Sequence, residues 1–176
     1  HPTFFLRSDV VEGVGGYQDH GWPEDYDLIL RMHLAGHRLA NVSDVLHQWR
    51  EAADRLSRID HRYKSEAFLR CRIHYLCRGP LTGSRDVIVW GAGPVGKSFA
   101  RAAMNRGIRV VAFVELDPRK IGQEIHGAPV LDIPEALRMR GPLHAAAVGQ
   151  YGARARIEGL LEQAGLVAGE DFVAVA

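Results

Sequence analysis

Two clusters of residues in this sequence have the types and spacing needed for chemistry, and the first is a glycine motif. Gly91, Gly93 and Gly96 form a G-x-G-x-x-G pattern directly after the apolar residues 87–90 and before a helical pattern over 94–106. The first glycine of such a motif permits a tight turn, the second lets backbone amides approach a phosphate, and the third lets helix and strand pack closely. Phosphate would rest on the helix start, where unpaired amides point outward. The motif predicts a site for NAD or another nucleotide.

An acid stands where a nucleotide-binding strand would place it. Glu115 directly follows the mainly apolar residues 109–114 and lies 24 residues after Gly91. This is close to the sequence separation at which an acid binds a ribose hydroxyl in such folds. Lys97 is either a ligand for phosphate or an ordinary solvated lysine at a helix start. The alternative is that the glycines only shape a turn and that nothing binds, because a fold does not fix a function.

The second cluster is a pair of adjacent carboxylates, Glu24 and Asp25, directly after Pro23. Proline and acids are both favoured at a helix start, so the pair predicts a helix over 24–35 that Gly36 ends. One carboxylate of such a pair can remove a proton from a hydroxyl group while the helix dipole and its neighbours tune it. The simpler interpretation is a helix cap with surface acids, and spacing alone favours it.

The elements around these clusters predict an α/β chain in two parts. Residues 1–78 contain an apolar strand over 1–7, the helix over 24–35, an extended segment over 39–46 and a basic amphipathic helix over 64–78. Residues 79–85 are a linker. Over 86–176 strands alternate with helices, which predicts a small, mainly parallel sheet covered on both faces. We expect strands over 87–90, 109–114, 128–131, 144–148 and 172–175, and helices over 94–106, 133–139 and 153–164.

The first part resembles the acceptor-side, carboxyl-terminal half of the GT-A domain of family 2 glycosyltransferases, in a mostly helical segment over residues 1–78. The motifs that carry the resemblance are, in order, His1-Pro2-Thr3, Gly15-Gly16-Tyr17, Glu24-Asp25-Tyr26-Asp27-Leu28, Gly36-His37-Arg38-Leu39, Val45-Leu46, Trp49-Arg50 and Arg55-Leu56-Ser57-Arg58. The resemblance implies an inverting sugar transfer from a nucleotide-sugar donor to a saccharide acceptor, as in polysaccharide biosynthesis.

The same resemblance assigns roles to individual residues. Asp25 would be the catalytic base, and Glu24 would orient the acceptor or the base. Trp49, Arg50 and Ser57 would lie on the loop that closes over the donor diphosphate, where a planar cation pairs well with phosphate oxygens.

A divalent metal, Mg or Mn, is expected for the parent transferase, but its ligands in this sequence are unknown. Many relatives carry a histidine two residues beyond the arginine of the donor loop, where this sequence has Ala52, and His47 is out of register. The metal-binding Asp-x-Asp half of a GT-A domain would precede His1, and Asp25-Tyr26-Asp27 belongs to the helix start instead. We therefore expect the chain to be a fragment that is inactive as a transferase by itself, and leave open whether it acts as an enzyme.

The second part is similar to the small Rossmann-like module at the amino end of sugar-modifying acetyltransferases. The matching residues are Val89-Trp90-Gly91-Ala92-Gly93, Phe113-Val114-Glu115-Leu116-Asp117-Pro118, Ile121-Gly122, Gly127-Ala128-Pro129-Val130, Ala147-Val148-Gly149 and Gly152-Ala153-Arg154. This resemblance leaves two further hypotheses open. One is a non-catalytic regulatory module that binds NAD or a nucleotide sugar. The other is an NAD-dependent sugar oxidoreductase, which is disfavoured because the sequence has no Tyr-x-x-x-Lys pair.

The composition of the chain limits the classes of partner and the cellular location that we expect. The formal net charge of +1 argues against a nucleic-acid partner, and no apolar run is long enough to span a membrane. Cys71 and Cys77 fit neither a zinc motif nor a disulfide framework, so a reducing, cytoplasmic location is expected. A half domain would expose apolar edges, which favours a homodimer.

Overall fold

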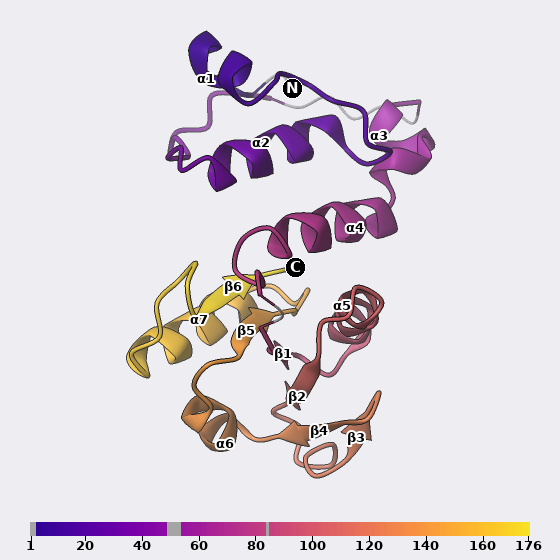
Figure 1. Ribbon diagram of the computed structural model, residues 1–176, viewed down its shortest axis with the longest axis vertical. Helices are drawn as coiled ribbons and strands as arrows, with labels where there is room; N and C mark the ends of the chain where they lie inside the picture. The colour runs from indigo at the N-terminus through magenta and orange to yellow at the C-terminus, as the bar shows by residue number, and fades with distance from the viewer. Residues whose placement is uncertain (1–2, 49–53, 84) are drawn as a thin grey trace. The chain divides into compact units, whose positions relative to one another are not determined.

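The computed structural model describes residues 3–48, 54–83 and 85–176. The chain divides into two compact units, His1–Tyr75 and Leu76–Ala176. The described residues of the first unit form helices only, and the second unit contains a six-stranded sheet (Figure 1). The chain is therefore an α/β protein with a helical segment and a separate sheet unit.

The first unit is organised around its second helix. Its elements are α1 (Ser8–Gly13), α2 (Glu24–Leu34), α3 (Leu56–Ile59), the 3-10 helix η1 (His61–Tyr63) and α4 (Ser65–Leu76). Leu28 and Met32 on α2 are buried, as are Cys71 and Ile73 on α4. Gly36 ends α2 as predicted: it has a φ of 82°, and the amides of Gly36 and His37 bond back to carbonyls of the last turn.

The predicted strand over residues 1–7 is not formed by its described part. Residues 3–7 have no regular secondary structure, and the side chain of Phe5 is fully exposed. An apolar run becomes a strand only where a neighbouring strand accepts its backbone hydrogen bonds. The described residues of the first unit supply no such neighbour, and residues 39–46 likewise form no strand.

The second unit has a mainly parallel sheet, as the alternation of elements predicted. The strands are β1 (Val87–Trp90), β2 (Val110–Val114), β3 (Glu124–Ile125), β4 (Ala128–Leu131), β5 (Leu143–Ala146) and β6 (Phe172–Ala174). Their order is β3-β4-β2-β1-β5-β6, and only the short β3, which the sequence did not indicate, pairs antiparallel. With helices on both faces, this is a Rossmann-like arrangement.

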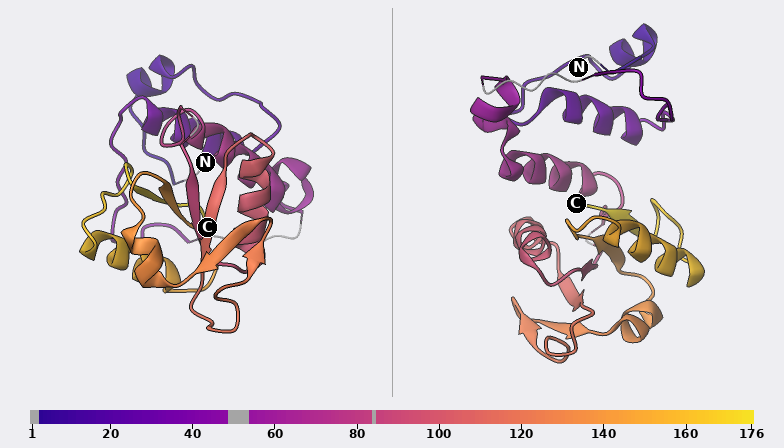
Figure 2. Two further views of the ribbon diagram at one scale, coloured as in Figure 1. Left: turned by 60° about the horizontal axis from the view of Figure 1, so that its bottom comes forward. Right: turned by 180° about the vertical axis from the view of Figure 1, so that it is seen from behind.

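Helices cover both faces of this sheet. Helix α5 (Pro94–Met104) lies on one face, and α6 (Ile133–Arg138) and α7 (Ala153–Gln163) lie on the other (Figure 2). On the α6–α7 face, Ile88 and Trp90 of β1 pack in one core with Leu161 and Phe172. The strands β1 and β5 are buried along their whole length, because both of their faces are covered.

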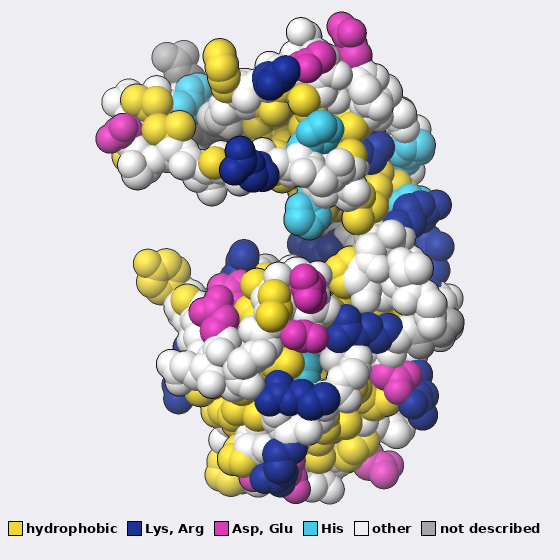
Figure 3. Space-filling model, turned by 60° about the vertical axis from the view of Figure 1, so that its left-hand side comes forward, with side chains coloured by type: hydrophobic (Ala, Val, Ile, Leu, Met, Phe, Trp, Pro, Cys, Tyr) yellow, Lys and Arg dark blue, Asp and Glu magenta, His cyan; other side chains and the backbone are white. Residues whose placement is uncertain are grey.

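The surface of the chain carries mixed charges. Acidic and basic side chains lie interspersed on the face shown in Figure 3, in keeping with the net charge of +1. Within the part of the chain that the structure describes, no helix combines the length and the apolar character needed to cross a bilayer.

Candidate functional site

A cavity of about 630 Å³ lies in the first unit at the start of α2. Its polar lining comes from two separate stretches of sequence and consists of Glu24, Asp25, Arg55, Ser57 and Tyr63. The structure thus brings together three of the residues selected from the sequence, namely Glu24, Asp25 and Ser57. They meet because α3 and η1 lie beside the first turn of α2.

The remaining lining of this cavity is apolar and largely aromatic: Phe4, Tyr26, Ile29, Leu56 and Phe68. The rings of Tyr26 and Phe68 have centroids 5.4 Å apart. Arg72 approaches from α4, and its Nε donates a hydrogen bond of 3.1 Å to the Tyr26 hydroxyl. Apolar walls with a few convergent polar groups are typical of small-molecule sites.

The two carboxylates of the cavity are half-buried and differently held. Glu24 accepts a short hydrogen bond, 2.6 Å, from the Tyr63 hydroxyl to its Oε2. Asp25 accepts one of 2.7 Å from the backbone amide of Tyr26 to its Oδ1. Burial, and then the hydrogen bond to Glu24, raise the pKa of Tyr63 above its usual value. The phenol therefore stays protonated at neutral pH and remains a donor to Glu24.

The third acid of this turn, Asp27, has a structural role in the core. Its buried carboxylate accepts hydrogen bonds from Trp22 Nε1 at 2.8 Å, Tyr75 Oη at 2.6 Å and Arg31 Nε at 2.8 Å. Burial alone would raise the pKa of Asp27, but these three donors outweigh it and hold the pKa below its usual range. Asp27 therefore stays ionised and ties α2 to α4 through Tyr75.

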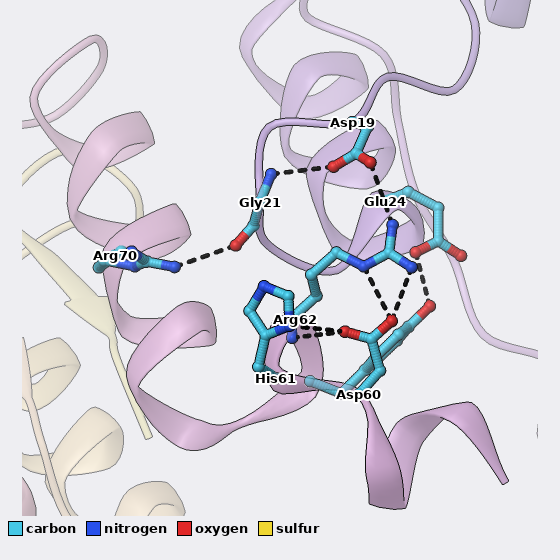
Figure 4. A network of polar contacts seen from close by, with 8 residues as sticks. Asp19, Gly21, Glu24, Asp60, His61, Arg62 and Arg70 are labelled. Atoms are coloured by element: carbon cyan, nitrogen blue, oxygen red, sulfur yellow. Dashed lines mark hydrogen bonds and ion pairs between the residues drawn. The ribbon is translucent and has the colours of Figure 1, made fainter.

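A second polar network holds the segment that carries Tyr63 (Figure 4). Arg62 donates two hydrogen bonds to Asp60, at 3.0 and 2.7 Å, and one of 3.1 Å to Asp19 in the loop before α2. Arg62 lowers the pKa of Asp60 to about 2, chiefly through its side-chain hydrogen bonds. The backbone carbonyl of Gly21 in the same loop accepts a hydrogen bond of 3.0 Å from Arg70 on α4. These contacts fix η1 beside the loop and so place Tyr63 at Glu24.

Two of the residues assigned to the donor loop, Trp49 and Arg50, lie outside the described residues, as does Ala52. His47 is exposed. Over residues 3–48, 54–83 and 85–176, no group of three or more His, Cys, Asp or Glu side chains could hold a metal ion. The described residues therefore do not fit a metal centre.

The tight turn and the close packing of helix on strand that were predicted from the first and third glycines of the motif are both formed. A Cβ on Gly96 would lie 1.8 Å from the Gly91 carbonyl oxygen, so only glycine lets α5 approach β1 this closely. Gly91 has a φ of 113°, and a Cβ there would meet Val148 Cγ1 at 2.7 Å. In contrast, a Cβ on Gly93 would have no atom within 4 Å and would enter open space in front of the helix.

A second cavity, of about 320 Å³, opens at the carboxyl ends of β1 and β2 in the second unit. Its lining includes Gly91 and Glu115 but neither Gly93 nor Gly96. The strand β1 lies between β2 and β5, so the chain order of the sheet reverses here. Ligands of open α/β sheets bind at this point, outside the carboxyl ends of the strands.

Glu115 is already paired at the edge of this cavity. Its Oε2 accepts a hydrogen bond of 2.9 Å from Lys120 Nζ, and its Oε1 accepts one of 2.9 Å from the Leu116 amide. Burial raises the pKa of Glu115, but Lys120 and the backbone donors outweigh that effect and lower it. The carboxylate is ionised, and the neighbouring ammonium group compensates its charge.

The structure adds residues that the sequence did not indicate. In the first cavity these are Tyr63, Phe4 and Phe68, and in the second they include Arg156 on α7. Arg55 and Tyr26 belong to motifs of the glycosyltransferase resemblance, which assigns no role to them. A tyrosine 39 positions from the glutamate that it contacts leaves no signal in the spacing of motifs. For Arg156, the helical pattern over 153–164 could have indicated a separate face, because Arg154 and Arg156 differ by about 200° around a helix axis.

Comparison with known proteins shows a partial sequence similarity to a glycosyltransferase. No protein-family model matches the chain. The amylovoran biosynthesis glycosyltransferase AmsE of Erwinia amylovora is 32% identical to this chain over 93 residues, which cover 44% of this chain and 35% of that protein. The chain thus spans about a third of the curated relative that it matches.

Three solved structures of RSP, a Rex-family repressor, resemble part of the chain. RSP itself has a TM-score of 0.45 at 16% identity, over 58% of this chain and 57% of that chain. The complex of RSP with β-NADH has a TM-score of 0.43 at 17% identity, over 52% and 53%. The complex with β-NAD+ and operator DNA has a TM-score of 0.43 at 17% identity, over 60% and 57%.

The prediction that nucleic acid is not a partner is wrong as an exclusion. It rested on the net charge of +1, and the repressor solved with operator DNA contradicts it. The physical reason is that nucleic-acid binding depends on where basic side chains gather, and a sum over the whole chain does not report that distribution.

Proposed function

We propose that the first unit is the acceptor side of an inverting glycosyltransferase that uses a nucleotide-sugar donor. The observation that carries the proposal is the first cavity, whose lining includes Glu24, Asp25, Arg55 and Ser57 together with aromatic side chains. The partial similarity to a glycosyltransferase agrees with it. The aromatic wall suits the apolar face of a sugar ring, and the carboxylates suit its hydroxyl groups.

In the proposed reaction, Asp25 takes the proton of an acceptor hydroxyl group. The hydroxyl oxygen then forms a bond to the anomeric carbon of the donor, and the bond from that carbon to the diphosphate oxygen breaks on the opposite side. The nucleoside diphosphate leaves with the bonding electrons, and the anomeric configuration inverts. Glu24, held by Tyr63, orients the acceptor. Ser57, together with Trp49 and Arg50, belongs to the donor side.

The assignment of the base is tested by Asp25→Asn in the protein as encoded in full. Release of UDP from UDP-glucose and UDP-galactose, with saccharide acceptors, measures the transfer. We expect kcat to fall by about 10²- to 10⁴-fold, the usual contribution of a general base. Asp9→Asn is the matched control, because Asp9 is an exposed acid in the first turn of α1 that pairs with Arg7 outside the cavity. Equal rates for Asp25→Asn and the unchanged protein would refute the assignment.

For the second unit we propose a nucleotide-binding, regulatory role. The observation that supports it is the second cavity at the reversal of strand order, next to a glycine loop with open space in front of Gly93. The first amides of a helix have no partner within the helix, and no side chain caps the start of α5, so these amides would be available to bind phosphate. Calorimetric titration of the chain with NAD, UDP and UDP-sugars tests this role. The absence of heat with all of them, at a protein concentration of about 0.1 mM suited to micromolar affinities, would exclude it.

A further inference from the structure

The lining of the second cavity contains one basic side chain, Arg156, to which the proposed nucleotide-binding role gives no function. Arg156 lines the cavity from the first two turns of α7, together with the apolar side chains of Trp90, Ile157 and Leu160. The only acid in the lining is Glu115, and its charge is compensated by Lys120 at 2.9 Å. The guanidinium of Arg156 is thus the charge that this cavity presents to a ligand.

The neighbouring arginine on α7 shows that this placement is specific. Arg154 lies outside the lining, and its Nε bonds to Glu158 Oε1 at 2.9 Å, one turn along the helix. Arg156 is exposed, and among the described residues its side chain has no hydrogen-bond or ion-pair partner. A planar guanidinium without a carboxylate partner, beside an apolar wall, can donate two parallel hydrogen bonds to two oxygens of a phosphate.

We propose that Arg156 anchors an anionic group of the ligand in the second cavity, and that the ligand is a phosphorylated nucleoside rather than a neutral one. The apolar body of the ligand packs against Trp90, Ile157 and Leu160, and one phosphate pairs with Arg156. This proposal rests on the nucleotide-binding role proposed for the second unit. It adds a determinant outside the glycine loop, on the helix that follows β5.

The test compares nucleosides with their phosphates on the complete 176-residue chain. Uridine, UMP and UDP, and in parallel adenosine, AMP and ADP, are titrated calorimetrically into the unchanged protein and into Arg156→Gln and Arg154→Gln. For the unchanged protein we expect the phosphates of one series to bind more tightly than the nucleoside. Arg156→Gln should weaken their binding by about 10- to 100-fold, the effect of removing a charge-assisted hydrogen bond, and should bring it close to that of the nucleoside. Arg154→Gln should leave it unchanged.

The outcomes separate this proposal from the one on which it depends. If nucleoside and nucleotide bind the unchanged protein equally well, or if the two arginine variants behave alike, the anchor is refuted and nucleotide binding stands. If neither series binds the unchanged protein, the anchor is refuted, and the nucleotide role fails with it if NAD and UDP-sugars do not bind either. Salt gives an independent check: raising the ionic strength should weaken nucleotide binding to the unchanged protein more than to Arg156→Gln. Circular dichroism of both variants verifies that the fold is retained.

Discussion

At the scale of single residues, three acids of one helical turn have two different environments. Glu24 and Asp25 line the first cavity, whereas Asp27 is fully buried between Arg31, Trp22 and Tyr75. We propose that Glu24 and Asp25 act in the reaction, whereas Asp27 stabilises the fold of the first unit. Substitutions at these neighbouring positions should therefore separate activity from folding.

Asp27→Asn should destabilise the first unit by about 3 kcal/mol, because it removes one partner of a buried ion pair and leaves Arg31 without its counter-charge. Urea unfolding, followed through the amide NMR signals of α2 and α4, measures the loss. Asp25→Asn is the control and should change the unfolding free energy by less than about 1 kcal/mol. Similar losses for both variants would contradict the structural role of Asp27.

Tyr63→Phe should lower the kcat of the proposed transfer about tenfold while leaving the fold intact, because it removes only the hydroxyl that orients Glu24. The transfer assay on the protein as encoded in full measures kcat and KM separately. Tyr17→Phe is a matched control on an exposed tyrosine outside the cavity. A Tyr63→Phe protein with unchanged kcat and KM would show that the hydrogen bond to Glu24 has no part in the reaction.

At the scale of elements, the turn from β1 to α5 contains glycines with two different roles, one in packing and one next to open space. Gly96 is required for packing, because its Cα lies against the Gly91 carbonyl, whereas Gly93 borders open space. The same motif therefore contains one position that sets the fold and one that a ligand can approach.

Gly96→Ala should destabilise the second unit by about 3 kcal/mol or more, since the new methyl group cannot fit against the Gly91 carbonyl without moving the helix. Gly93→Ala should leave the unfolding free energy within about 1 kcal/mol of the unchanged value, because its backbone φ of −86° suits alanine. It should instead weaken nucleotide binding, by filling the space in front of α5. Thermal unfolding and calorimetric titration of the two variants measure these effects, and a stable Gly96→Ala protein would contradict the packing argument.

The strands β1 and β5 are joined by a buried side-chain pair that is sensitive to pH. Trp90 Nε1 donates to His144 Nδ1 at 3.0 Å, and His144 Nε2 lies 3.1 Å from the Met139 carbonyl oxygen. The ring is therefore neutral, with its proton on Nε2. Burial lowers the pKa of His144 below its usual 6.5.

The stability of the second unit should fall as the pH drops below about 6.5. The unfolded chain takes up the proton at the ordinary pKa, whereas the folded unit resists it until a lower pH, so unfolding binds a proton in this window. Urea unfolding at pH 7.5 and pH 5.5, followed by amide NMR signals of the sheet, measures the difference. His144→Gln should reduce this pH dependence, and an equal dependence in both proteins would exclude His144 as its source.

At the scale of the whole molecule, the chain divides into two compact units. Among the described residues, all strands and the helices α5, α6 and α7 that cover the sheet belong to Leu76–Ala176. Each of the two cavities is lined by residues of one unit alone. Each proposal can therefore be tested without assumptions about the other unit.

Residues 76–176 expressed alone should fold with the same sheet, because this range forms a compact unit and contains the whole core cluster of the α6–α7 face. The amide NMR spectrum of this fragment should overlay on the signals of the same residues in the complete chain. A spectrum without dispersed signals would show that the second unit depends on the first.

Sequence alone determined the alternation of strands and helices over 86–176, the glycine turn between β1 and α5, and the start and end of α2. These features depend on contacts between near neighbours: Gly96 packs on Gly91, and Gly36 closes the last turn of the helix that precedes it. Periodicity and turn residues report such contacts directly.

Only the tertiary structure decided which side chains share a site. It brings Tyr63 into contact with Glu24, 39 residues away in the sequence, and it gives Asp27, two positions from the proposed base, a structural role. It also pairs Glu115 with Lys120 and places Arg156 in the lining of the second cavity. It also shows that the apolar residues 3–7 form no strand. All of these findings have the same physical reason. They depend on contacts between residues that are distant in sequence, or on a neighbouring strand, and local residue spacing does not report such contacts.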